Sequence, residues 1–581
     1  MASGWILKCT PTFEEIKTMH RKNKCERRLA LLFFLVVWAQ SLFSQTDTFN
    51  ISINTQKDIG KMQPLWAWFG YDEPNYTYMK DGKKLLTEIA ALSKTPVYVR
   101  AHSLLTTGDG KAALKWGSTN AYTEDANGNP IYSWTIVDSI FDVLIKRGMK
   151  PMAEIGFTPE AMSVKPQPYR HYWKPGDKYS DIYTGWSYPP KDYAKWSELI
   201  FQWVKHCVAK YGETEVTTWR WEVWNEPDIS YWQGTTAEYF KLYDYTVDAV
   251  KRACPKAIVG GPATTDPSNP KAKKFLKDFL THCASDTNYA TQKIGSPIDF
   301  ISFHAKGSPK VVDKHVRMNL GKELSNVANG FETVYASAFS QLPIIISECD
   351  PEGCAACGMK TSPQNAYRNG TMYSSYTAAA YTRLYELADA YKVNLVGAVT
   401  WAFEFEDQPW FEGFRDLATN GVDKPVLNVF RMFGMMQGNR VEVLNPKRFS
   451  ALQIKDNGVT AQPDIHAFAS RDSHSVSILL WNYHDDDLVG NPAMISLLLR
   501  GLPTKNAVLK HYRIDKDHSN SYEVWKKMGS PQKPTAAQYK ELEQSGQLAL
   551  LSKPKKIKML NETKLSIELP RQGVSLLSIS W

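Results

Sequence analysis

The sequence predicts an α/β fold, a (β/α)8 TIM barrel with a C-terminal β-sandwich domain. Three observations predict it. The chain has 581 residues, too many for one ordinary core. From about residue 64 to 438, short apolar runs alternate with helix-like stretches, as expected for parallel strands that are each followed by a helix. After about residue 440, short strand-like runs follow one another closely, which is typical of a sandwich.

Eight apolar runs are predicted as the barrel strands. They are Pro64–Gly70, Pro96–Ala101, Lys150–Gly156, Thr218–Trp224, Ala257–Gly261, Asp299–His304, Pro343–Ser347 and Leu395–Phe403. Between them lie helical patterns with apolar residues every three to four positions, such as Tyr193–Tyr211 and Thr236–Ala253. A doubly wound sheet is the alternative, but the sequence lacks the Gly-rich phosphate loop expected after an early strand.

The second domain is predicted over residues 439–581. Its expected strands include Ala467–Ala469, Ser475–Trp481, Met494–Leu499, Ala507–Ile514, Lys564–Leu569 and Val574–Ile579. A polar helical and loop insertion interrupts them at residues 517–550. The barrel is expected over residues 64–438. Within residues 45–63, the early strand Phe49–Ile53 has no partner in the barrel, so we expect it to join the sandwich.

Residues 1–44 are predicted to be a leader with a secretory signal at about residues 19–44. Arg27 and Arg28 precede the apolar run Leu29–Ala39, and small residues follow, which is the order of a signal peptide. The run is shorter than the roughly 20 residues that span a bilayer. We therefore expect a secreted or periplasmic protein without a membrane segment after signal cleavage.

The distribution of charge argues against a nucleic-acid partner, and the spacing of the cysteines argues against a bound metal ion. The formal net charge is +9, but much of the excess lies in the leader and in Lys553–Lys558, so a solvated basic face is favoured over nucleic-acid binding. Cys354 and Cys357 have metal-like spacing, but no second C-x-x-C or His pair accompanies them. A local disulfide or two free thiols is expected there, and no metal or other cofactor is predicted.

Two carboxylates stand at the ends of predicted strands. Glu226 follows strand four within Trp224-Asn-Glu-Pro-Asp228, and Glu348 follows strand seven. The carboxyl ends of barrel strands meet at one mouth, where active sites lie. Glycosidic cleavage needs one carboxylic acid that protonates the leaving oxygen and one carboxylate that attacks or activates water. The pattern therefore predicts a glycosidase, whereas an isolated strand-end Glu would be read as a structural charge.

The residues around these carboxylates resemble clan A glycoside hydrolases, and the ordered set resembles family 39. The further matching segments are Val99–Ser103, Ala153–Pro159, Asp299–His304, Trp401–Phe403, Gly421–Pro425, His511–Asp515, His518–Asn520 and Met528–Gln532. The resemblance covers essentially the whole chain after the leader. It implies a retaining double displacement through a covalent glycosyl-enzyme, with Glu226 as acid/base and Glu348 as nucleophile.

The resemblance also implies roles for surrounding residues. Asn225 is expected to hold the sugar 2-hydroxyl, His304 to orient Glu348, and His102 to bind substrate. Arg100 is expected to support the nucleophile, and Trp401 to form the floor of the subsite for the terminal sugar. Simpler readings are a structural ion partner for Arg100 and a core residue for Trp401.

The family contains mainly β-xylosidases and α-L-iduronidases, whose sugars differ at the fifth carbon. Lys306 resembles the iduronidase pattern, and Arg415 on the loop after strand eight is expected to reach the same pocket. A uronate carboxylate needs such cations. The acids Glu352, Glu404, Glu406 and Asp407 would instead repel an anion and accept hydrogen bonds from neutral hydroxyls. The sequence therefore favours an exo-acting β-xylosidase on xylo-oligosaccharides or related plant glycans, with an iduronidase-like or α-L-arabinopyranosidase activity as alternatives.

Other classes fit less well. A carbohydrate-binding protein on a degenerate scaffold would have lost one carboxylate, and both are present. A metal-dependent hydrolase would need a ligand cluster, for which His102, His304 and Cys349 are the available residues without a supporting motif. Transglycosylation shares the glycosyl-enzyme intermediate with hydrolysis. The expected partner is an oligosaccharide or glycoside substrate, and the sequence leaves the oligomeric state open.

Overall fold

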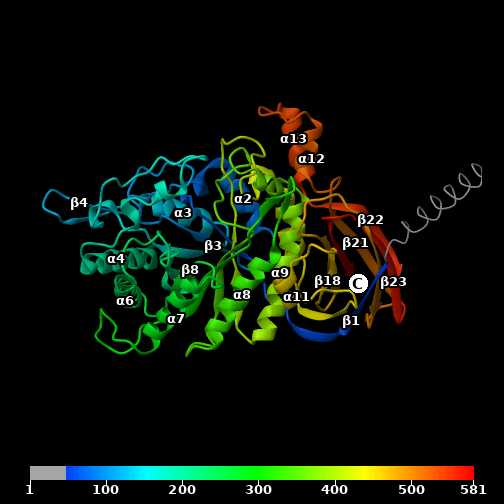
Figure 1. Ribbon diagram of the computed structural model, residues 1–581, viewed down its shortest axis with the longest axis horizontal. Coiled ribbons are helices and arrows are strands. Elements are labelled where there is room, and N and C mark those ends of the chain that lie inside the picture. Colours follow the sequence, from blue (N-terminus) through cyan, green and yellow to red (C-terminus); the bar gives the residue numbers. More distant parts are fainter. Residues whose placement is uncertain (1–47) are drawn as a thin grey trace, which may run out of the picture. The chain divides into compact units, whose positions relative to one another are not determined.

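The computed structural model describes residues 48–581, which Figure 1 shows as a ribbon. These residues contain a barrel of parallel strands. The predicted leader lies outside the described residues. The barrel strands are β2 (Trp68–Tyr71), β3 (Tyr98–Ala101), β6 (Lys150–Ile155), β7 (Arg220–Val223), β8 (Ile258–Thr264), β9 (Phe300–Lys306), β12 (Ile344–Asp350) and β13 (Leu395–Ala398), which β14 (Thr400–Trp401) continues. β13 pairs with β12 and β14 pairs with β2, so the two halves of strand eight close the ring.

A helix follows every barrel strand. These helices are α2 (Lys80–Ala90), α3 (Thr135–Ile145), α4 (Tyr193–Tyr211), α6 (Thr236–Ala253), α7 (Pro270–Ser285), α8 (Leu320–Tyr335), α9 (Thr371–Tyr391) and α10 (Pro425–Gly434). The bounds predicted for α4 and α6 are confirmed. α4 begins where the Asp192 carboxylate accepts two backbone N–H groups, and α6 begins at a capping box between Thr235 and Glu238.

Short elements fill the loops of the barrel. They are α5 (Glu213–Val216), the hairpins β4 (Tyr122–Glu124) with β5 (Pro130–Tyr132), β10 (Lys310–Val312) with β11 (His315–Arg317) and β15 (Ala418–Thr419) with β16 (Val422–Asp423), and the 3-10 turns Pro74–Tyr78, Glu160–Met162, Tyr179–Ile182, Gly185–Ser187 and Pro363–Asn369. The long loops at the carboxyl ends of the strands supply the walls of the site described below.

The second sheet has nine strands in the order β22-β21-β24-β19-β18-β17-β1-β20-β23. They are β1 (Thr48–Lys61), β17 (Asn439–Leu444), β18 (Asp464–Arg471), β19 (Ser475–Tyr483), β20 (Ala493–Arg500), β21 (Asn506–Ile514), β22 (Ala549–Lys558), β23 (Glu562–Leu569) and β24 (Val574–Ser580). Apolar side chains from both halves of this continuous sheet form one buried cluster, so the sheet encloses its core as a sandwich does. The predicted fold class is confirmed.

The two sheets meet through helix α9, which lies between them in Figure 1. Buried Arg383 of α9 donates to Asp464 of β18 at 2.8 Å. The short helix α11 (Ala451–Asn457) packs against α8. No helix among residues 48–581 is long and apolar enough to cross a membrane.

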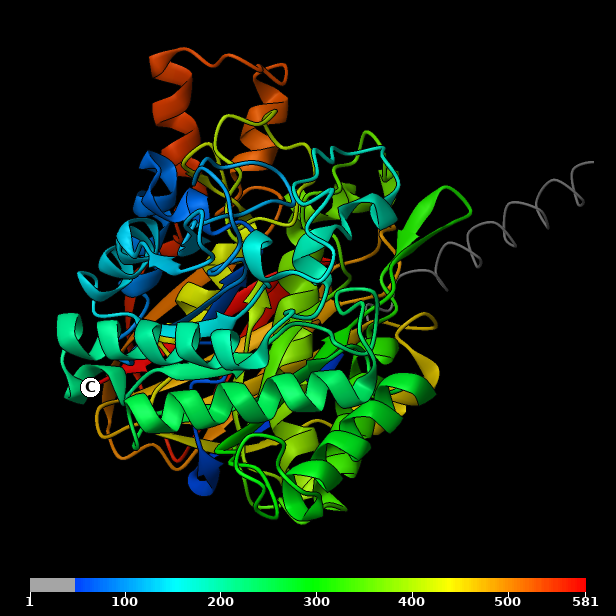
Figure 2. The same ribbon diagram turned by 90° about the vertical axis from the view of Figure 1, so that its left-hand side faces the viewer.

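The insertion predicted at residues 517–550 contains two helices, α12 (Ser521–Lys527) and α13 (Ala536–Gly546). In Figure 2 these orange helices stand beside the yellow loop that follows barrel strand eight. Trp525 and Leu542 of the insertion share a buried cluster with Trp410 and Phe411 of that loop. The second domain therefore packs directly against a loop at the mouth of the barrel.

Candidate active site

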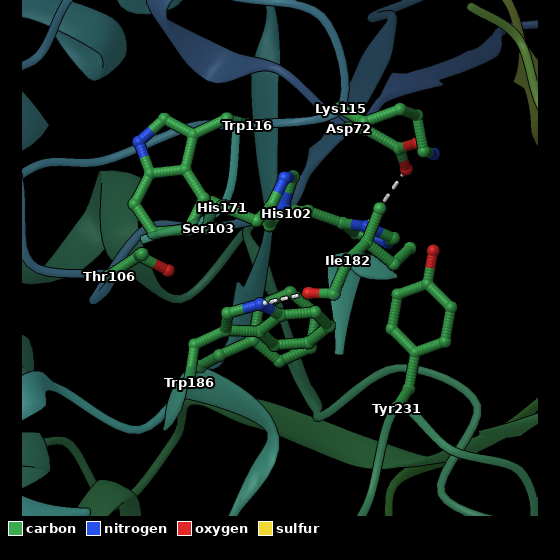
Figure 3. Close-up of a pocket in the computed structure, with 11 residues that line it drawn as sticks. Asp72, His102, Ser103, Thr106, Lys115, Trp116, His171, Ile182, Trp186 and Tyr231 are labelled. Atoms are coloured by element: carbon green, nitrogen blue, oxygen red, sulfur yellow. Dashed lines mark hydrogen bonds and ion pairs between the residues drawn. The ribbon is translucent and has the colours of Figure 1, made fainter. Parts of the chain in front are cut away.

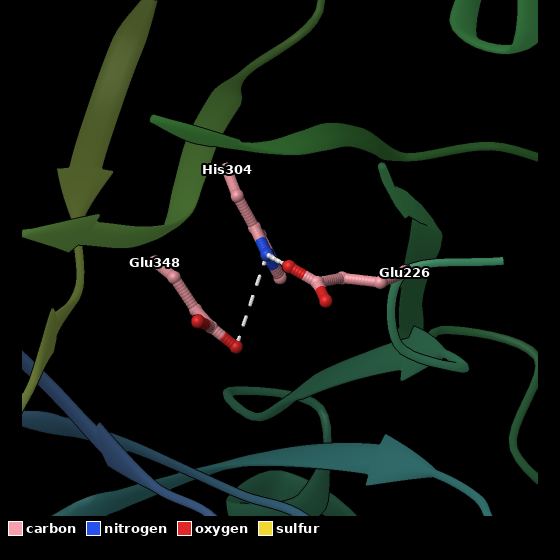
Figure 4. A group of neighbouring side chains, drawn as sticks. All are labelled: Glu226, His304 and Glu348. Atoms are coloured by element: carbon pink, nitrogen blue, oxygen red, sulfur yellow. Dashed lines mark hydrogen bonds and ion pairs between the residues drawn. The ribbon is translucent and has the colours of Figure 1, made fainter. Parts of the chain in front are cut away.

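Two carboxylates meet at the mouth of the barrel. Glu348 lies on β12, and Glu226 follows the end of β7. One carboxylate oxygen of each and a ring nitrogen of His304 all lie within 4.8 Å of one another (Figure 4). Glu226 has a φ of +47°, a left-handed conformation that non-glycine residues seldom adopt outside functional sites. Its backbone N–H is held by the carbonyl of Ala263 at 2.9 Å.

The Glu226 carboxyl group favours its protonated form. Its Oε1 atom lies 2.8 Å from Nδ1 of His304, and its side chain is 16% exposed. Burial, followed by the negative charges of Glu348 and Asp228, raises the pKa of Glu226 to about 8. Burial also lowers the pKa of His304 to about 3, so this histidine is neutral and adds no positive charge. Glu226 can therefore donate a proton at neutral pH.

The Glu348 carboxyl group favours its ionised form. Burial alone would raise its pKa, but the positive charges of Lys306 and Arg100 outweigh this effect and hold the pKa well below its ordinary value. Arg100 donates to Oε1 at 3.1 Å, and Nζ of Lys306 lies 2.7 Å from Oε2. The two carboxylates thus have pKa values shifted in opposite directions, which is the pattern of an acid paired with an ionised partner.

Arg100 on β3 connects most of the predicted residues. This fully buried guanidinium forms an ion pair with Glu222 and donates to Oδ1 of Asn225 at 3.0 Å. It also lies 2.8 Å from Nε2 of His102. Because arginine can only donate, Nε2 of His102 is the acceptor, and the His102 proton is therefore on Nδ1. Nδ1 of His102 points at Asp72, 3.0 Å away.

His304 lies near both carboxylates. Its shorter contact is to Glu226, at 2.8 Å, and it lies 3.8 Å from Glu348, the carboxylate that it is expected to orient. Both contacts are made through the same ring nitrogen, Nδ1, as the dashed lines in Figure 4 show. A histidine motif at a strand end indicates a position in the site, but it does not indicate which of two facing carboxylates the ring contacts.

Trp401 lies at the centre of the group. Its ring centroid is 4.9 Å from the Arg100 guanidinium and 4.4 Å from the His102 ring. Its indole N–H donates to Asp72 at 3.1 Å, and its backbone N–H donates to Asp350 at 2.7 Å. The residue is therefore fixed at both its ring and its backbone.

The two cations expected to face a uronate are already engaged by carboxylates. Lys306 lies 2.7 Å from Glu348 and 3.5 Å from Asp350. Arg415 is buried, donates to the backbone carbonyl of Trp401 at 2.8 Å, and lies 3.7 Å from Glu352. Arg415 is thus held by the backbone of Trp401, and Lys306 is held against Glu348.

The acids expected to accept hydrogen bonds from a neutral sugar have other partners. Glu404 accepts the backbone N–H of Gly421, and Glu406 accepts that of Asp81 at 2.9 Å. Glu352 forms an ion pair with Arg368. Glu352, Glu404 and Glu406 thus each bind a group on another segment of the chain, and the use of these acids and of Asp407 as substrate acceptors stays a prediction. Sequence patterns identify acids near a strand end without indicating which backbone groups they bind.

A small cavity lies beside His102, whose Nε2 atom is 3.7 Å from Oε1 of Glu348. Figure 3 shows Trp116, Trp186 and Tyr231 around it, with His102 and His171 between them. Its lining includes residues that sequence reasoning missed: Asp72, Lys115, Trp116, His171, Trp186 and Tyr231. Asp72 directly follows β2. Its position at a strand end, the same signal that identified Glu226 and Glu348, could therefore have identified it from the sequence. Lys115 lies in a long loop without any motif.

Glu226, His304 and Glu348 lie close enough to ligate a cation. Arg100 and Lys306 already contact Glu348, however, and their positive charges would repel a metal ion there. Cys349 is directed to Glu323, with 3.3 Å between Sγ and Oε1. Cys354 and Cys357 form a disulfide, which removes both thiols as zinc ligands.

Comparisons with known proteins agree with this geometry. The model of the family "Glycosyl hydrolases family 39" matches residues 49–557. The chain is 28% identical to a β-xylosidase of Caldicellulosiruptor saccharolyticus, covering 86% of this chain and 91% of that protein. It is 22% identical to the α-L-iduronidase of Mus musculus, covering 88% and 78% respectively. A monomeric β-xylosidase from Caulobacter crescentus has the same fold, with a TM-score of 0.70, 23% identity, and coverage of 92% and 99%. The carboxylate pair, the barrel and the match over most of the chain together place this protein in glycoside hydrolase family 39, as a glycosidase that hydrolyses O-glycosyl bonds.

Proposed function

We propose that the protein is a retaining, exo-acting β-xylosidase with Glu226 as acid/base and Glu348 as nucleophile. The observation that carries the proposal is the short separation of the two carboxylates, whose nearest oxygens lie within 4.8 Å. Retaining glycosidases have carboxyl groups about 5–5.5 Å apart, whereas inverting ones need about 6.5–9.5 Å to admit a water molecule. The separation supports direct attack by Glu348.

In the first step, Glu348 attacks the anomeric carbon while protonated Glu226 donates its proton to the leaving oxygen. The C–O bond to the leaving group breaks, and an ester between the sugar and Glu348 forms. In the second step, ionised Glu226 takes a proton from water, which attacks the anomeric carbon and releases Glu348. The raised pKa of Glu226 and the lowered pKa of Glu348 suit these roles.

Asn225 is assigned to the sugar 2-hydroxyl. Its side-chain oxygen accepts a hydrogen bond from Arg100, which orients the amide and leaves its two N–H donors for a ligand. A hydrogen bond to the 2-hydroxyl can strengthen in the transition state. Arg100 acts as the positioning residue because it contacts Asn225, Glu348 and His102.

Xylose is the proposed sugar because the cations nearest the carboxylates are balanced by acids. Arg100 pairs with Glu222 and Glu348, and Lys306 with Glu348 and Asp350. A uronate carboxylate would have to displace one of these partners. The similarity to two β-xylosidases at 28% identity supports the same choice. An iduronidase-like uronide hydrolase is the second candidate, favoured by the position of Lys306 beside Glu348.

A panel of aryl glycosides tests the proposal: β-xyloside, α-L-iduronide, α-L-arabinopyranoside and β-glucoside. We expect the highest kcat/KM with the β-xyloside and, by NMR, a first product of retained configuration. If the enzyme hydrolyses the iduronide and leaves the xyloside intact, the terminal sugar of the substrate is a uronate and the assignment of xylose is wrong. A first product of inverted configuration would overturn the assignment of Glu348 as nucleophile.

Export is the remaining part of the proposal. The basic, apolar and small residues of the leader support signal cleavage near residue 44. Intact-mass analysis of protein recovered from the extracellular or periplasmic fraction should give a chain that lacks this leader. Recovery of the full-length chain from the cytoplasmic fraction would contradict export.

A further inference from the structure

An ion pair is buried in the wall of the cavity beside His102. Asp72 follows β2, and Lys115 lies in the loop after β3; their side chains are 11% and 4% exposed. Lys115 also has a φ of +53°, a strained value for a residue with a side chain. A buried ion pair stabilises a fold little, because desolvation offsets the attraction of its charges. Burial, charge and strain together at the edge of a cavity point to ligand binding.

The hydrogen-bonding groups of this pair are only partly used. Oδ1 of Asp72 faces both His102 and Trp401, at 3.0 and 3.1 Å, whereas Oδ2 faces Lys115. Each carboxylate oxygen can accept about two hydrogen bonds, so Oδ2 retains one acceptor site. A lysine ammonium has three N–H donors, and Asp72 is the one hydrogen-bond acceptor of Lys115 within residues 48–581. The pair therefore offers two donors and one acceptor to a ligand.

His102 connects the pair to the catalytic carboxylate Glu348. His102 lines the cavity, contacts Asp72, and lies 3.7 Å from Oε1 of Glu348. Trp116 and Trp186 supply aromatic walls. A sugar ring with its anomeric carbon at Glu348 that extends past His102 would direct its remote hydroxyls at Asp72 and Lys115.

We propose that Asp72 and Lys115 bind the 3- and 4-hydroxyl groups of the terminal sugar and so determine which sugar the enzyme accepts. Neighbouring hydroxyls can donate one hydrogen bond to Asp72 and accept two from Lys115, which matches the free groups of the pair. This inference rests on the proposed glycosidase function and deepens it.

The test compares 4-nitrophenyl β-xyloside with its 3-deoxy and 4-deoxy analogues, in the wild-type enzyme and in Lys115→Met. In the wild type, removal of a bound hydroxyl should lower kcat/KM by about 10- to 100-fold, as expected for hydrogen bonds to charged groups. In Lys115→Met, kcat/KM for the parent xyloside should fall, and the analogues should come within about twofold of it. Exposed Lys165, which contacts Tyr188, provides the matched control Lys165→Met. This control should keep the wild-type ratio of kcat/KM between the parent xyloside and each deoxy analogue.

The ratio of parent to analogue is measured within one preparation, so a misfolded fraction does not affect it. Should Lys115→Met fail to fold, Asp72→Asn provides the same ratio. A Lys115→Met enzyme with the full wild-type ratio, or a wild type indifferent to both deoxygenations, would overturn the inference. If the wild type hydrolyses another glycoside of the panel instead, xylose is wrong, and deoxygenated analogues of that glycoside test the Asp72–Lys115 pair separately.

Discussion

The Nδ1 atom of His304 lies 2.8 Å from Oε1 of Glu226, so the proposed acid is held by a neutral histidine on a different strand. His304 comes from β9 and Glu226 from the segment after β7. This contact fixes the carboxyl group where a leaving oxygen would receive its proton. It also gives His304 a role that is separable from nucleophilic attack.

We expect His304→Ala to slow protonation of the leaving group. For a glycoside with a poor leaving group, kcat/KM should fall by about 100-fold, because general acid catalysis contributes at least that much. For an activated dinitrophenyl glycoside, which needs little protonation, the loss should be about tenfold smaller. Steady-state kinetics on both substrates would detect this split. Equal losses on the two would show that His304 does not act through Glu226.

Replacement of the two carboxylates should give different outcomes. Glu348→Gln should lower kcat by at least about 10⁴-fold, because the nucleophile is removed. Glu226→Ala should retain cleavage of an activated aryl glycoside, and azide should increase it by entering the space that the carboxyl group leaves. Mass spectrometry and NMR should identify a glycosyl azide of retained configuration. If azide instead restores the activity of Glu348→Gln and has no effect on Glu226→Ala, the roles of acid/base and nucleophile must be exchanged between the two residues.

The raised pKa of Glu226 predicts the alkaline limit of activity. The proton donor must be protonated in the free enzyme, and its pKa is about 8, so kcat/KM should fall as the pH rises through about 8. In Glu226→Ala, with an activated substrate, this alkaline limb should disappear. A pH–rate profile of both enzymes checks this, and persistence of the limb in the variant would assign it to another group.

Lys306 should affect the acidic limit of activity. Its ammonium lies 2.7 Å from Glu348 and helps to lower the pKa of that carboxyl. Lys306→Met removes the cation, so the pKa of Glu348 should rise, and the ionised nucleophile should be lost at a higher pH. The acid limb of kcat/KM should therefore move upward. An unmoved limb would mean that Arg100 alone keeps Glu348 ionised.

Trp525 of the insertion should contribute to stability. It is 5% exposed, its ring centroid is 5.0 Å from that of Phe411, and its indole N–H donates to the carbonyl of Pro531 at 3.0 Å. Trp525→Ala should lower the free energy of unfolding by about 3 kcal/mol, a typical cost for a large buried side chain. Exposed Lys527 on the same helix provides the control Lys527→Ala, with an expected change within about 0.5 kcal/mol. Thermal unfolding of both variants measures the difference.

The sequence predicts the barrel well because its strands are buried on both faces and read as apolar runs. It misses β17 and β22 for the opposite reason. β17 (NRVEVL) mixes charges with a few buried residues, and β22 (ALLSKPKKIK) lies mostly exposed at the edge of its sheet, where lysines and proline are favoured. Such strands have no apolar run to reveal them.

The proximity of Glu226 and Glu348 is predictable because each Glu directly follows an apolar run that the sequence predicts as a strand. Lys115 is not predictable, because its partner Asp72 lies 43 residues earlier, and only the folded loops bring the two together. The contacts of Glu352, Glu404 and Glu406 are similarly hidden, since each acid binds a group on a distant segment. Strand-end position indicates nearness to the barrel mouth, whereas hydrogen-bond partners depend on loop conformation.

Strand β1 lies between β17 and β20, although the whole barrel separates it from them in the sequence. During synthesis, this 14-residue strand leaves the ribosome long before either neighbouring strand is made. Until then both of its edges are unpaired and exposed to aggregation. An expression clone that starts at residue 64 would remove an inner strand from the sandwich, and one that stops at residue 438 would leave β1 with neither neighbour. The two domains are therefore one folding unit, and neither can be cut out at a simple boundary.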